Sequence, residues 1–245
     1  PLLKTLIHDI DDYHLPRYGC FHNAAFVRIG KEYALQARRV MHSIWGAGQM
    51  AWTKSIVVVD AETPVHDENA VIETLMRRCN FARDVEIVHG PLDILDHAAP
   101  HVGAGTKIGF DATRRCAGEE MDGRGLQDPR LPGDAQRDEA MNVITALKGV
   151  DIASSSLPKA GLGRLAILAV HRGTPHAGVR AIERLFEELP ESVVMLHCAE
   201  TACMRFHRIS EIHSVFLALV RIGARSWSLI FEVMLDRVLT NVNRI

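Results

Sequence analysis

Residues 33–60 constrain the fold of this chain more than any other stretch. Their apolar residues recur with the spacing of one helix face, which carries Ala37, Val40, Met41, Ile44 and Trp45. Two glycines then interrupt the helical pattern, and a β-branched run over 55–59 ends at Asp60. With a further strand over 24–29 in front, the stretch predicts a strand–helix–strand unit of an α/β fold. In such folds ligands tend to lie beyond the carboxyl ends of the strands.

The composition fits one large domain or two small ones, because the chain has 245 residues with 47% hydrophobic content. Its net charge of −2 provides no strong field to attract nucleic acid or an anionic membrane. No apolar run reaches the ~18 residues of a transmembrane helix, and no signal-peptide pattern opens the sequence. The five cysteines show no paired spacing, so we expect a reducing compartment and a cytoplasmic protein. Because the first residue is Pro1, we interpret the sequence as a fragment or a processed chain.

The chain is predicted to have three parts. Residues 1–115 form an α/β domain, in which Asp67 is expected to cap a helix over 70–78 that turns Val71, Leu75 and Met76 inward. Residues 116–139 form a linker or exposed loop, because Gly, Asp, Arg, Glu, Gln and Pro dominate there. Residues 140–245 contain a second βαβ unit and a helical tail.

The second unit looks like a degenerate copy of the first. Residues 166–170 align with 25–29, and an amphipathic helix is expected over 178–189. The pair Ala-Glu at 199–200 aligns with Ala-Glu at 61–62. We therefore expect βαβ units on a mostly parallel or mixed sheet, in two copies.

The C-terminal stretch over 210–243 is apolar and poor in glycine, and its period predicts helix. It has more apolar residues than one packed helix face needs. Two interpretations remain open: a buried hairpin of two helices broken near Gly223, or a helical surface that binds a partner subunit.

The sequence contains no convincing metal site. His97 and His101 lie four residues apart, but Pro100 between them prevents a regular helix. Cys198 and Cys203 match no zinc-binding spacing. We expect no metal ligand in this chain.

No complete catalytic set is visible either. The segment 103–107, GAGTK, could bring Lys107 to a phosphate, although a plain turn is the commoner structure of such a short segment. Acidic residues follow expected strands, where they would reach a cleft, and these are Asp60, Asp93, Asp96 and Asp111. Because none has an evident catalytic partner, capping or ion pairing is the favoured role.

Several stretches occur together over about residues 1–115. They are DYHLP at 12–16, GC at 19–20, YALQARRVM at 33–41, WTKSIVVVD at 52–60, ARD at 82–84, GPLDILD at 90–96 and GTKIGFDAT at 105–113. In this order they resemble the C-terminal domain of the UbiD family of decarboxylases. Their joint occurrence is specific, whereas any one of them alone would be weak evidence.

The resemblance implies reversible, non-oxidative decarboxylation of a small aromatic or α,β-unsaturated carboxylic acid. Enzymes of this family use a prenylated flavin mononucleotide (prenylated FMN) together with Mn2+ and K+. Their metal ligands, flavin-cradling loop and catalytic acids lie in the N-terminal and middle parts of the full enzyme, and no stretch here matches those parts. The resemblance therefore implies no catalytic or metal residue in this chain. It also implies a flavin-binding N-terminal domain outside this sequence as the partner.

The resemblance also predicts where this chain would contact the substrate and the cofactor in the full enzyme. It implies a substrate wall at Pro91 and Leu92, with Ile94 nearby. In some members a basic residue in the turn between helix and strand approaches the flavin phosphate. This chain has Gln49 at that turn, so Lys54 is the nearest candidate for a cofactor contact.

The WGAGQM turn at 45–50 and the second half from about residue 140 resemble the menaquinone-biosynthesis branch of the family more closely, whose substrate would be a dihydroxynaphthoate. A homo-oligomer is expected and no nucleic-acid partner. The quinone pathway leaves open a peripheral membrane association. Two other hypotheses remain: a non-catalytic regulatory or oligomerisation module that associates through 210–243, and an enzyme that binds a phosphorylated ligand at 103–107.

Overall fold

In a computed structural model, this protein forms two compact units, Pro1–Arg130 (unit 1) and Leu131–Ile245 (unit 2). The residues that the structure describes are 2–17, 23–94, 96, 101–120, 125–147, 152–171, 185, 188–189, 193, 195–201, 216–223 and 226–233. Each unit has a five-stranded mixed sheet, which confirms the predicted α/β fold class.

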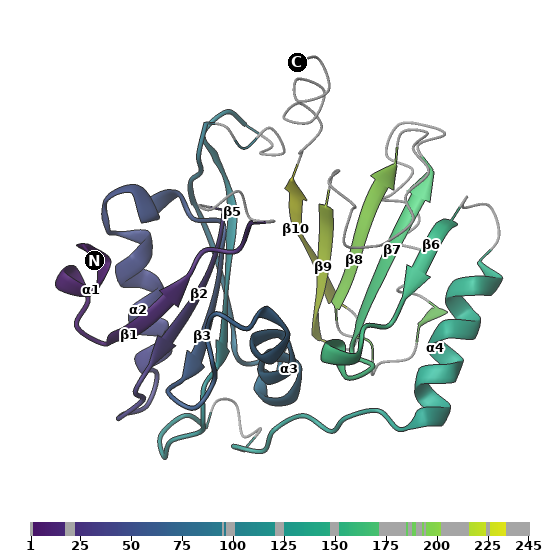
Figure 1. The fold of residues 1–245 in the computed structure, drawn as a ribbon, viewed down its shortest axis with the longest axis horizontal. Helices are drawn as coiled ribbons and strands as arrows, with labels where there is room; N and C mark the ends of the chain where they lie inside the picture. The colour runs from purple at the N-terminus through teal and green to yellow at the C-terminus, as the bar shows by residue number, and fades with distance from the viewer. Residues whose placement is uncertain are drawn as a thin grey trace. The chain divides into compact units, whose positions relative to one another are not determined.

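Unit 1 contains the strand–helix–strand unit that its sequence predicts over 24–60 (Figure 1). Its elements are α1 (Leu2–Leu6), β1 (Ile10–His14), β2 (Ala24–Ile29), α2 (Gln36–Trp45), the 3-10 helix η2 (Gly48–Trp52), β3 (Ser55–Asp60), α3 (Glu68–Arg78), β4 (Val85–Pro91) and β5 (Ala104–Ala112). The strand order is β1-β2-β3-β5-β4. Strands β2, β3 and β5 are parallel, and the outer strands β1 and β4 run antiparallel to their neighbours.

The helices of unit 1 follow local signals in the sequence. The Asp67 side chain caps α3 as expected and accepts hydrogen bonds from the backbone N–H groups of Asn69 and Ala70, at 3.0 and 3.2 Å. Helix α2 ends at Trp45, where Gly46 donates to carbonyls of the last turn. Of the residues predicted to face inward on α2 and α3, Trp45 is only partly buried, and the others are buried, namely Ala37, Val40, Met41, Ile44, Val71, Leu75 and Met76.

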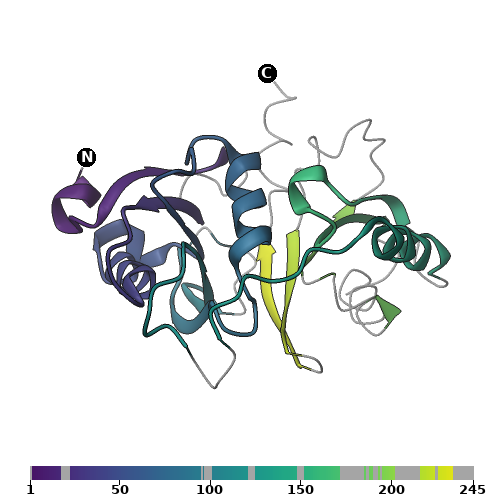
Figure 2. The same cartoon turned by 90° about the horizontal axis from the view of Figure 1, so that it is seen from below.

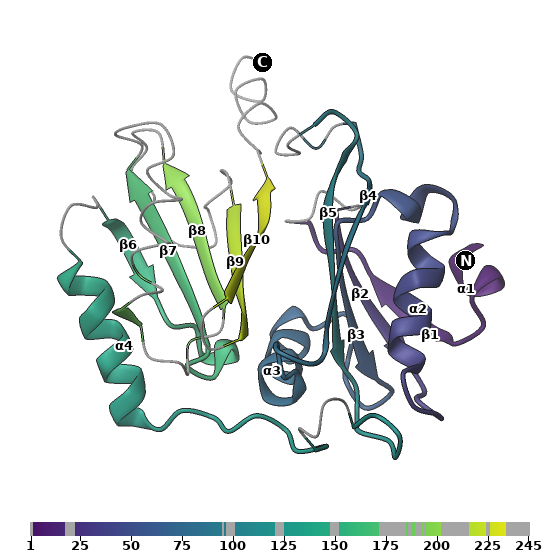
Figure 3. The same cartoon turned by 180° about the vertical axis from the view of Figure 1, so that it is seen from behind.

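The two helices cover opposite faces of the sheet. Figure 3 shows α2 and α3 on either side of β3 and β5 from behind, and Figure 2 shows the same separation from below. On the α2 face, the helix packs against Ile56 and Val58 of β3 and against alternate residues of β2. Neighbouring residues of β3, Val57 and Val59, are also buried, so the central strand is covered on both faces.

Unit 2 repeats this architecture in part. Its elements are α4 (Asp134–Ala146), β6 (Ile152–Ser156), the 3-10 helix η3 (Lys159–Gly161), β7 (Leu165–His171), β8 (Met195–Thr201), β9 (Phe216–Gly223) and β10 (Ser226–Val233). The strand order is β10-β9-β8-β7-β6, and only the pair β7–β8 is parallel. Its core joins Ala140 and Ile144 of α4 to Ala166 and Leu168 of β7.

The pairing of the strands supports the predicted duplication. In unit 1, β1 pairs antiparallel with β2 and Ile10 lies opposite Ile29, directly before a shift of register. In unit 2, β6 pairs antiparallel with β7 and Ile152 lies opposite Val170, again directly before a shift. Since Val170 aligns with Ile29 in the sequence, the two copies share an irregularity at the same position. Each then continues into a parallel strand, β3 or β8.

The end of the second copy is aligned differently from the sequence prediction. Asp60 lies opposite Ile29, and Glu200 lies opposite Val170. Glu200 therefore corresponds to Asp60 and not to Glu62, because the span from Val170 to Glu200 is one residue shorter than the span from Ile29 to Asp60. Most of the helix predicted over 178–189 lies outside the described residues, although Leu185 and Leu189 are buried in the core of unit 2.

The prediction of a helical C-terminal tail is wrong for the part of the tail that the structure describes. Residues 216–223 and 226–233 form the antiparallel strands β9 and β10. A continuous apolar run suits a buried strand as well as a buried helix, and periodicity alone cannot separate them. Gly223 marks the turn as expected, but the hairpin joins strands. The rest of the predicted tail lies outside the described residues.

Two other segments have more regular structure than their sequence suggested. Helix α4 begins at Asp134, inside the predicted linker over 116–139 and before the expected start at residue 140. Most of the segment 103–107, interpreted as a loop, is the beginning of β5, because its backbone pairs with the end of β4. None of the helices among the described residues is long and apolar enough to cross a membrane.

Gly109 tests the packing between β5 and α2. A Cβ added there would lie 2.4 Å from Met41 Sδ and 3.1 Å from Trp45, so Gly109→Ala should lower the free energy of unfolding by about 1–3 kcal/mol. Chemical denaturation followed by tryptophan fluorescence measures the loss. At Gly46 an added Cβ would meet only ordinary contacts of 3.5 Å or more, so Gly46→Ala is the control. Equal stability of both variants would contradict the packing described here.

Candidate functional site

The parallel strands give the sheet of unit 1 two edges of different character. At the carboxyl edge, β2, β3 and β5 end near Lys31, Asp60 and Asp111. At the amino edge the same strands begin and β4 ends, so this edge comprises residues 51–55, 90–96 and 101–107. Because open α/β sheets usually bind ligands at the carboxyl edge, that edge is considered first.

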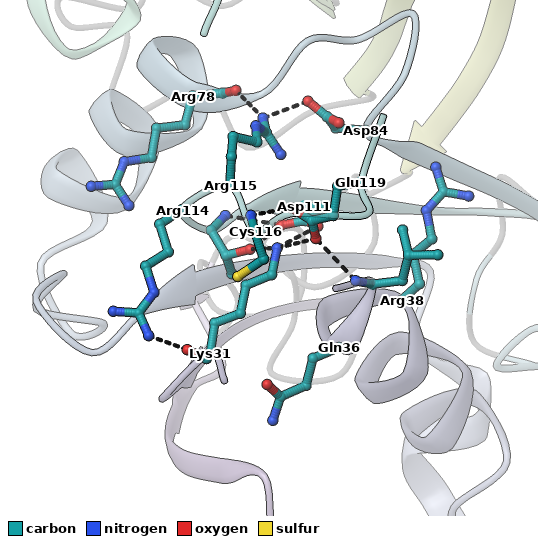
Figure 4. A network of polar contacts seen from close by, with 12 residues as sticks. Lys31, Gln36, Arg38, Arg78, Asp84, Asp111, Arg114, Arg115, Cys116 and Glu119 are labelled. Carbon is teal, nitrogen blue, oxygen red and sulfur yellow. Dashed lines mark hydrogen bonds and ion pairs between the residues drawn. The ribbon is translucent and has the colours of Figure 1, made fainter. Parts of the chain in front are cut away.

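A buried lysine organises the carboxyl edge. Lys31 is fully buried, and its Nζ donates to Thr113 Oγ1 at 2.8 Å. The same Nζ lies 3.6 Å from an oxygen of Asp111 and contacts the Glu119 carboxylate. Figure 4 shows Lys31 pointing toward Asp111 and Glu119. A buried ammonium group requires such partners, because removal from water strongly disfavours an unpaired charge.

The two carboxylates respond to this environment in opposite directions. Burial opposes the charge of Glu119, but hydrogen bonds from Lys31 and from the backbone N–H groups of Cys116 and Leu35 outweigh it and lower the pKa of Glu119. Burial raises the pKa of Asp111, and the nearby Lys31 and Thr113 compensate only in part. Glu119 is therefore the principal counter-charge of Lys31.

Arginine residues fix the following segment, 113–120, to the same edge (Figure 4). The Arg114 backbone N–H donates to Asp60, and its side chain donates to the Lys31 carbonyl. Arg115 donates to Asp84 at 2.6 Å and to the Arg78 carbonyl. This chain thus fills its own carboxyl edge, where a ligand lies in other α/β folds. The edge has the chemistry of a structural anchor.

The residues predicted to act as site residues lie at the opposite edge. Lys54 directly precedes β3 and is buried, with its Nζ 2.6 Å from Asp96 Oδ2. Asp96, which follows β4, is also buried. Three of the four acids predicted at strand ends make ion pairs, as the sequence favoured: Asp60 with Arg78, Asp96 with Lys54, and Asp111 with Lys31.

The predicted wall residues differ in exposure. Pro91 ends β4 and is exposed, whereas Leu92 is buried and its N–H donates to the Gly103 carbonyl at 2.8 Å. The Ile94 side chain is 73% exposed, and Val102 is 90% exposed. The structure thus brings Lys54 and the predicted wall to one edge, and their roles in binding stay predictions.

A second lysine at the amino edge was noted in the sequence only as part of a possible phosphate loop. Lys107 of β5 is buried, and its Nζ donates to the Ala51 carbonyl of η2. Burial lowers its pKa to about 8. The β3–β5 register places Lys107 beside Lys54, because the Ile108 N–H donates to the Lys54 carbonyl at 2.8 Å. The spacing of the two lysines in the sequence gives no sign of this pairing.

The sequence also missed Glu119, which lies in the stretch interpreted as a linker. No local signal distinguishes its role, because its partners Lys31 and Leu35 lie more than eighty residues away. No group of three or more potential metal ligands occurs among the described residues. Of the weak metal candidates, His97 and Cys203 lie outside the described residues.

Residues 1–112 match the model of the 3-octaprenyl-4-hydroxybenzoate carboxy-lyase C-terminal domain (UbiD_C). The match confirms the resemblance to the UbiD-family C-terminal domain for this part of the chain. It covers unit 1 through the end of β5.

Curated relatives match the same half of the chain. An uncharacterised protein of Archaeoglobus fulgidus is 42% identical over 120 residues, which are 49% of this chain and 25% of that protein. Uncharacterised proteins of Aquifex aeolicus and Helicobacter pylori are 43% and 38% identical over 115 and 117 residues, which are 24% and 19% of their lengths and 47% of this chain in both cases. The matched region thus spans a quarter or less of these relatives.

Solved structures with a partial likeness include UbiD-class enzymes and aromatic acid decarboxylases. The UbiD-class enzyme HmfF from Pelotomaculum thermopropionicum, in complex with FMN, has 24% identity and a TM-score of 0.43, over 55% of this chain and 29% of that chain. Vanillic acid decarboxylase of Sedimentibacter hydroxybenzoicus has 22% identity and a TM-score of 0.46, over 60% and 31%.

Glu119→Gln tests the anchor at the carboxyl edge. It leaves the buried Lys31 without its principal counter-charge, so the free energy of unfolding at pH 7 should fall by roughly 3 kcal/mol. Because the folded-state pKa of Glu119 is lowered, its contribution is complete above the ordinary value of 4.5 and is lost as the pH falls through the folded pKa. The difference between variant and parent should therefore shrink in acid.

Denaturation curves between pH 7 and pH 3 measure this dependence. The neighbouring exposed Glu120 provides the control, since Glu120→Gln should change stability by less than about 0.5 kcal/mol. A loss for Glu119→Gln that stays constant with pH would be inconsistent with an ionised Glu119 as the anchor.

Proposed function

We propose that this chain is the C-terminal part of a UbiD-like carboxy-lyase, which removes carbon dioxide without oxidation from a small aromatic or unsaturated carboxylic acid. The match of residues 1–112 to the C-terminal domain of a carboxy-lyase family is the observation that carries the proposal. The much greater length of the curated relatives supports a larger enzyme of which this is one part. In that enzyme the chain supplies a substrate wall and contacts between subunits.

The amino edge is the proposed face toward the reaction. Ile94 and Val102 expose apolar side chains there, and Trp52 is 41% exposed. Apolar side chains beside a few polar groups are typical of a site for a flat aromatic ligand. The exposed Ile94, together with Pro91 and Leu92, would contact the ring of the substrate, as the resemblance predicts.

A prenylated FMN is the proposed cofactor, held mainly by a flavin-binding N-terminal domain outside this sequence. When bound, such a flavin supplies an electron sink for the carbanion left by decarboxylation. The buried lysines of the amino edge fit the phosphate end of this group, with Lys54 as the predicted contact. By contrast, the described residues offer no ligand set for Mn2+, so a metal site in the full enzyme would need ligands from elsewhere.

The pathway, the exact substrate and the assembly of the full enzyme are part of the same proposal. A place in quinone biosynthesis, with a dihydroxynaphthoate substrate of the menaquinone branch, is supported by sequence resemblance alone. Homo-oligomer formation, the K+ requirement and peripheral membrane association likewise belong to the proposed full enzyme. Assays with naphthoate and hydroxybenzoate acids as alternative substrates address the branch.

A non-catalytic oligomerisation module is the second candidate. Strand β10 is the outermost strand in the sheet that the structure describes for unit 2. An outer strand offers unpaired backbone groups to a second copy of the chain. Light scattering distinguishes this candidate, because a monomer at high protein concentration would count against it.

The isolated chain should not decarboxylate. Incubated with prenylated FMN, Mn2+, K+ and a panel of aromatic acids, it should release no carbon dioxide above the protein-free background. Labelled substrate with carbon dioxide trapping measures this. Multiple turnovers by the chain alone would mean that the catalytic groups are present here after all.

Ile94→Asp tests the substrate wall in a complete enzyme. The chain would be joined to the preceding part of the Archaeoglobus fulgidus relative, in place of the 120 matching residues. A charged side chain at the wall should lower kcat/KM for an aromatic acid by at least about tenfold, equivalent to ~1.4 kcal/mol. Leu6→Asp is the matched control, because Leu6 is 60% exposed on α1. Equal loss in both variants would argue against a wall at Ile94.

A further inference from the structure

Lys107 is a buried cation whose charge is not compensated within the described part of the chain. Its side chain is 2% exposed, and its Nζ donates to the carbonyl of Ala51, which carries only a partial negative charge. No carboxylate of the described residues pairs with it, and burial alone accounts for the lowering of its pKa to about 8. A buried, uncompensated ammonium group destabilises the fold, and such groups concentrate at binding sites.

Lys54 brings a second buried ammonium group to the same edge. Its backbone is the neighbour of Lys107 across the β3–β5 ladder. The Lys54 ammonium pairs with Asp96, at 2.6 Å, with both side chains buried. Lys107 therefore lies beside the ion pair of Lys54 and Asp96, and its own ammonium group has no paired carboxylate among the described residues.

We propose that Lys54 and Lys107 form a binding site for a phosphate group, and that the Asp96 carboxylate occupies the Lys54 side of this site when no phosphate is bound. A phosphate oxygen would take the place of the Ala51 carbonyl as the acceptor for Lys107. The second charge of a phosphate dianion would interact with Lys54, in competition with Asp96. A monovalent carboxylate would gain less, because Asp96 already supplies one negative charge.

The surroundings of Lys107 allow such an exchange. Its cover is η2, a short 3-10 helix in which no residue is buried. On the other side, Gly90 has no side chain, and an added Cβ there would lie 3.5 Å from Lys107 Cε. The exposed Trp52 belongs to the same η2 segment. The Lys107 ammonium group thus contacts a short segment whose own residues are not buried.

The inference deepens the proposed function, on which it rests for the ligand that bears the phosphate. The flavin phosphate is the expected source in the full enzyme, where Lys54 is the predicted contact. The structure adds Lys107 as the cation with an uncompensated charge and Asp96 as an internal competitor. A free phosphorylated ligand has the same chemistry, so the test begins with inorganic phosphate and compares it with FMN.

Other charged groups lie on the elements around Lys107, and Asp93 lies between β4 and Asp96 at the same edge. Asp96 is paired with Lys54, and Glu86 of β4 is paired with Arg38 at 2.7 Å and lies 3.5 Å from His42, both of α2. His89 of β4 interacts with Thr106 on the exposed side. Burial lowers the pKa of Lys107 to about 8, so phosphate binding should take up protons near that pH.

Isothermal titration calorimetry of the full chain with inorganic phosphate tests the site. We expect saturable binding that weakens above pH 8, with uptake of about half a proton at pH 8, measured in buffers of different ionisation enthalpy. Lys107→Met should lower the affinity by about tenfold or more and abolish the proton uptake. Lys159→Met removes one exposed lysine of unit 2 and should change neither quantity.

Asp96→Asn should change the phosphate affinity in the direction opposite to that of Lys107→Met. Removal of the internal competitor should raise the phosphate affinity several-fold, provided that thermal melting shows a folded variant. Lys107→Met should melt at the same or a higher temperature at pH 7, because it removes a buried charge that destabilises the fold.

Each outcome either supports or overturns the inference. Absence of saturable phosphate binding, or equal binding by Lys107→Met and the parent chain, overturns it even if the joined enzyme decarboxylates. Phosphate binding that depends on Lys107 supports it even if no decarboxylation is found, and then only the proposed function fails. Tighter binding of FMN than of inorganic phosphate identifies the flavin as the source of the phosphate.

Discussion

The buried contact of Lys31 with Glu119 and Asp111 is the interaction on which unit 1 depends. It joins the end of β2 to the end of β5 and to a segment that follows the last strand. A charge removed from water must find partners, so this contact fixes the positions of all three elements at once. The arginine contacts of Arg114 and Arg115 extend the same anchor to β3 and α3.

This anchor has a consequence for function. The edge at which α/β sheets usually bind ligands is filled here by the chain itself. The opposite edge carries exposed apolar residues such as Ile94, the buried pair of Lys54 and Asp96, and the uncompensated Lys107. A role as one wall of a larger active site fits this distribution better than a self-contained catalytic site does.

Much of unit 1 could be predicted from local sequence signals. The strand over 24–29, the Asp67 cap and the inward face of α2 depend on nearby residues and were predicted correctly. The C-terminal stretch was predicted as helix but forms β9 and β10, because a continuous apolar run has no decisive period. Lys54 was selected by family resemblance, whereas Lys107 gained its significance only from the register of β5.

The sequence by itself determined the α/β class and the family resemblance and predicted a duplication, since these depend on periodicity and on motifs of neighbouring residues. Only the tertiary structure decided which lysines are buried and which acids pair with them. Glu119 reaches Lys31, and Asp96 reaches Lys54, across separations of 88 and 42 residues. Electrostatic energies depend on distance and burial, and neither can be read along the chain.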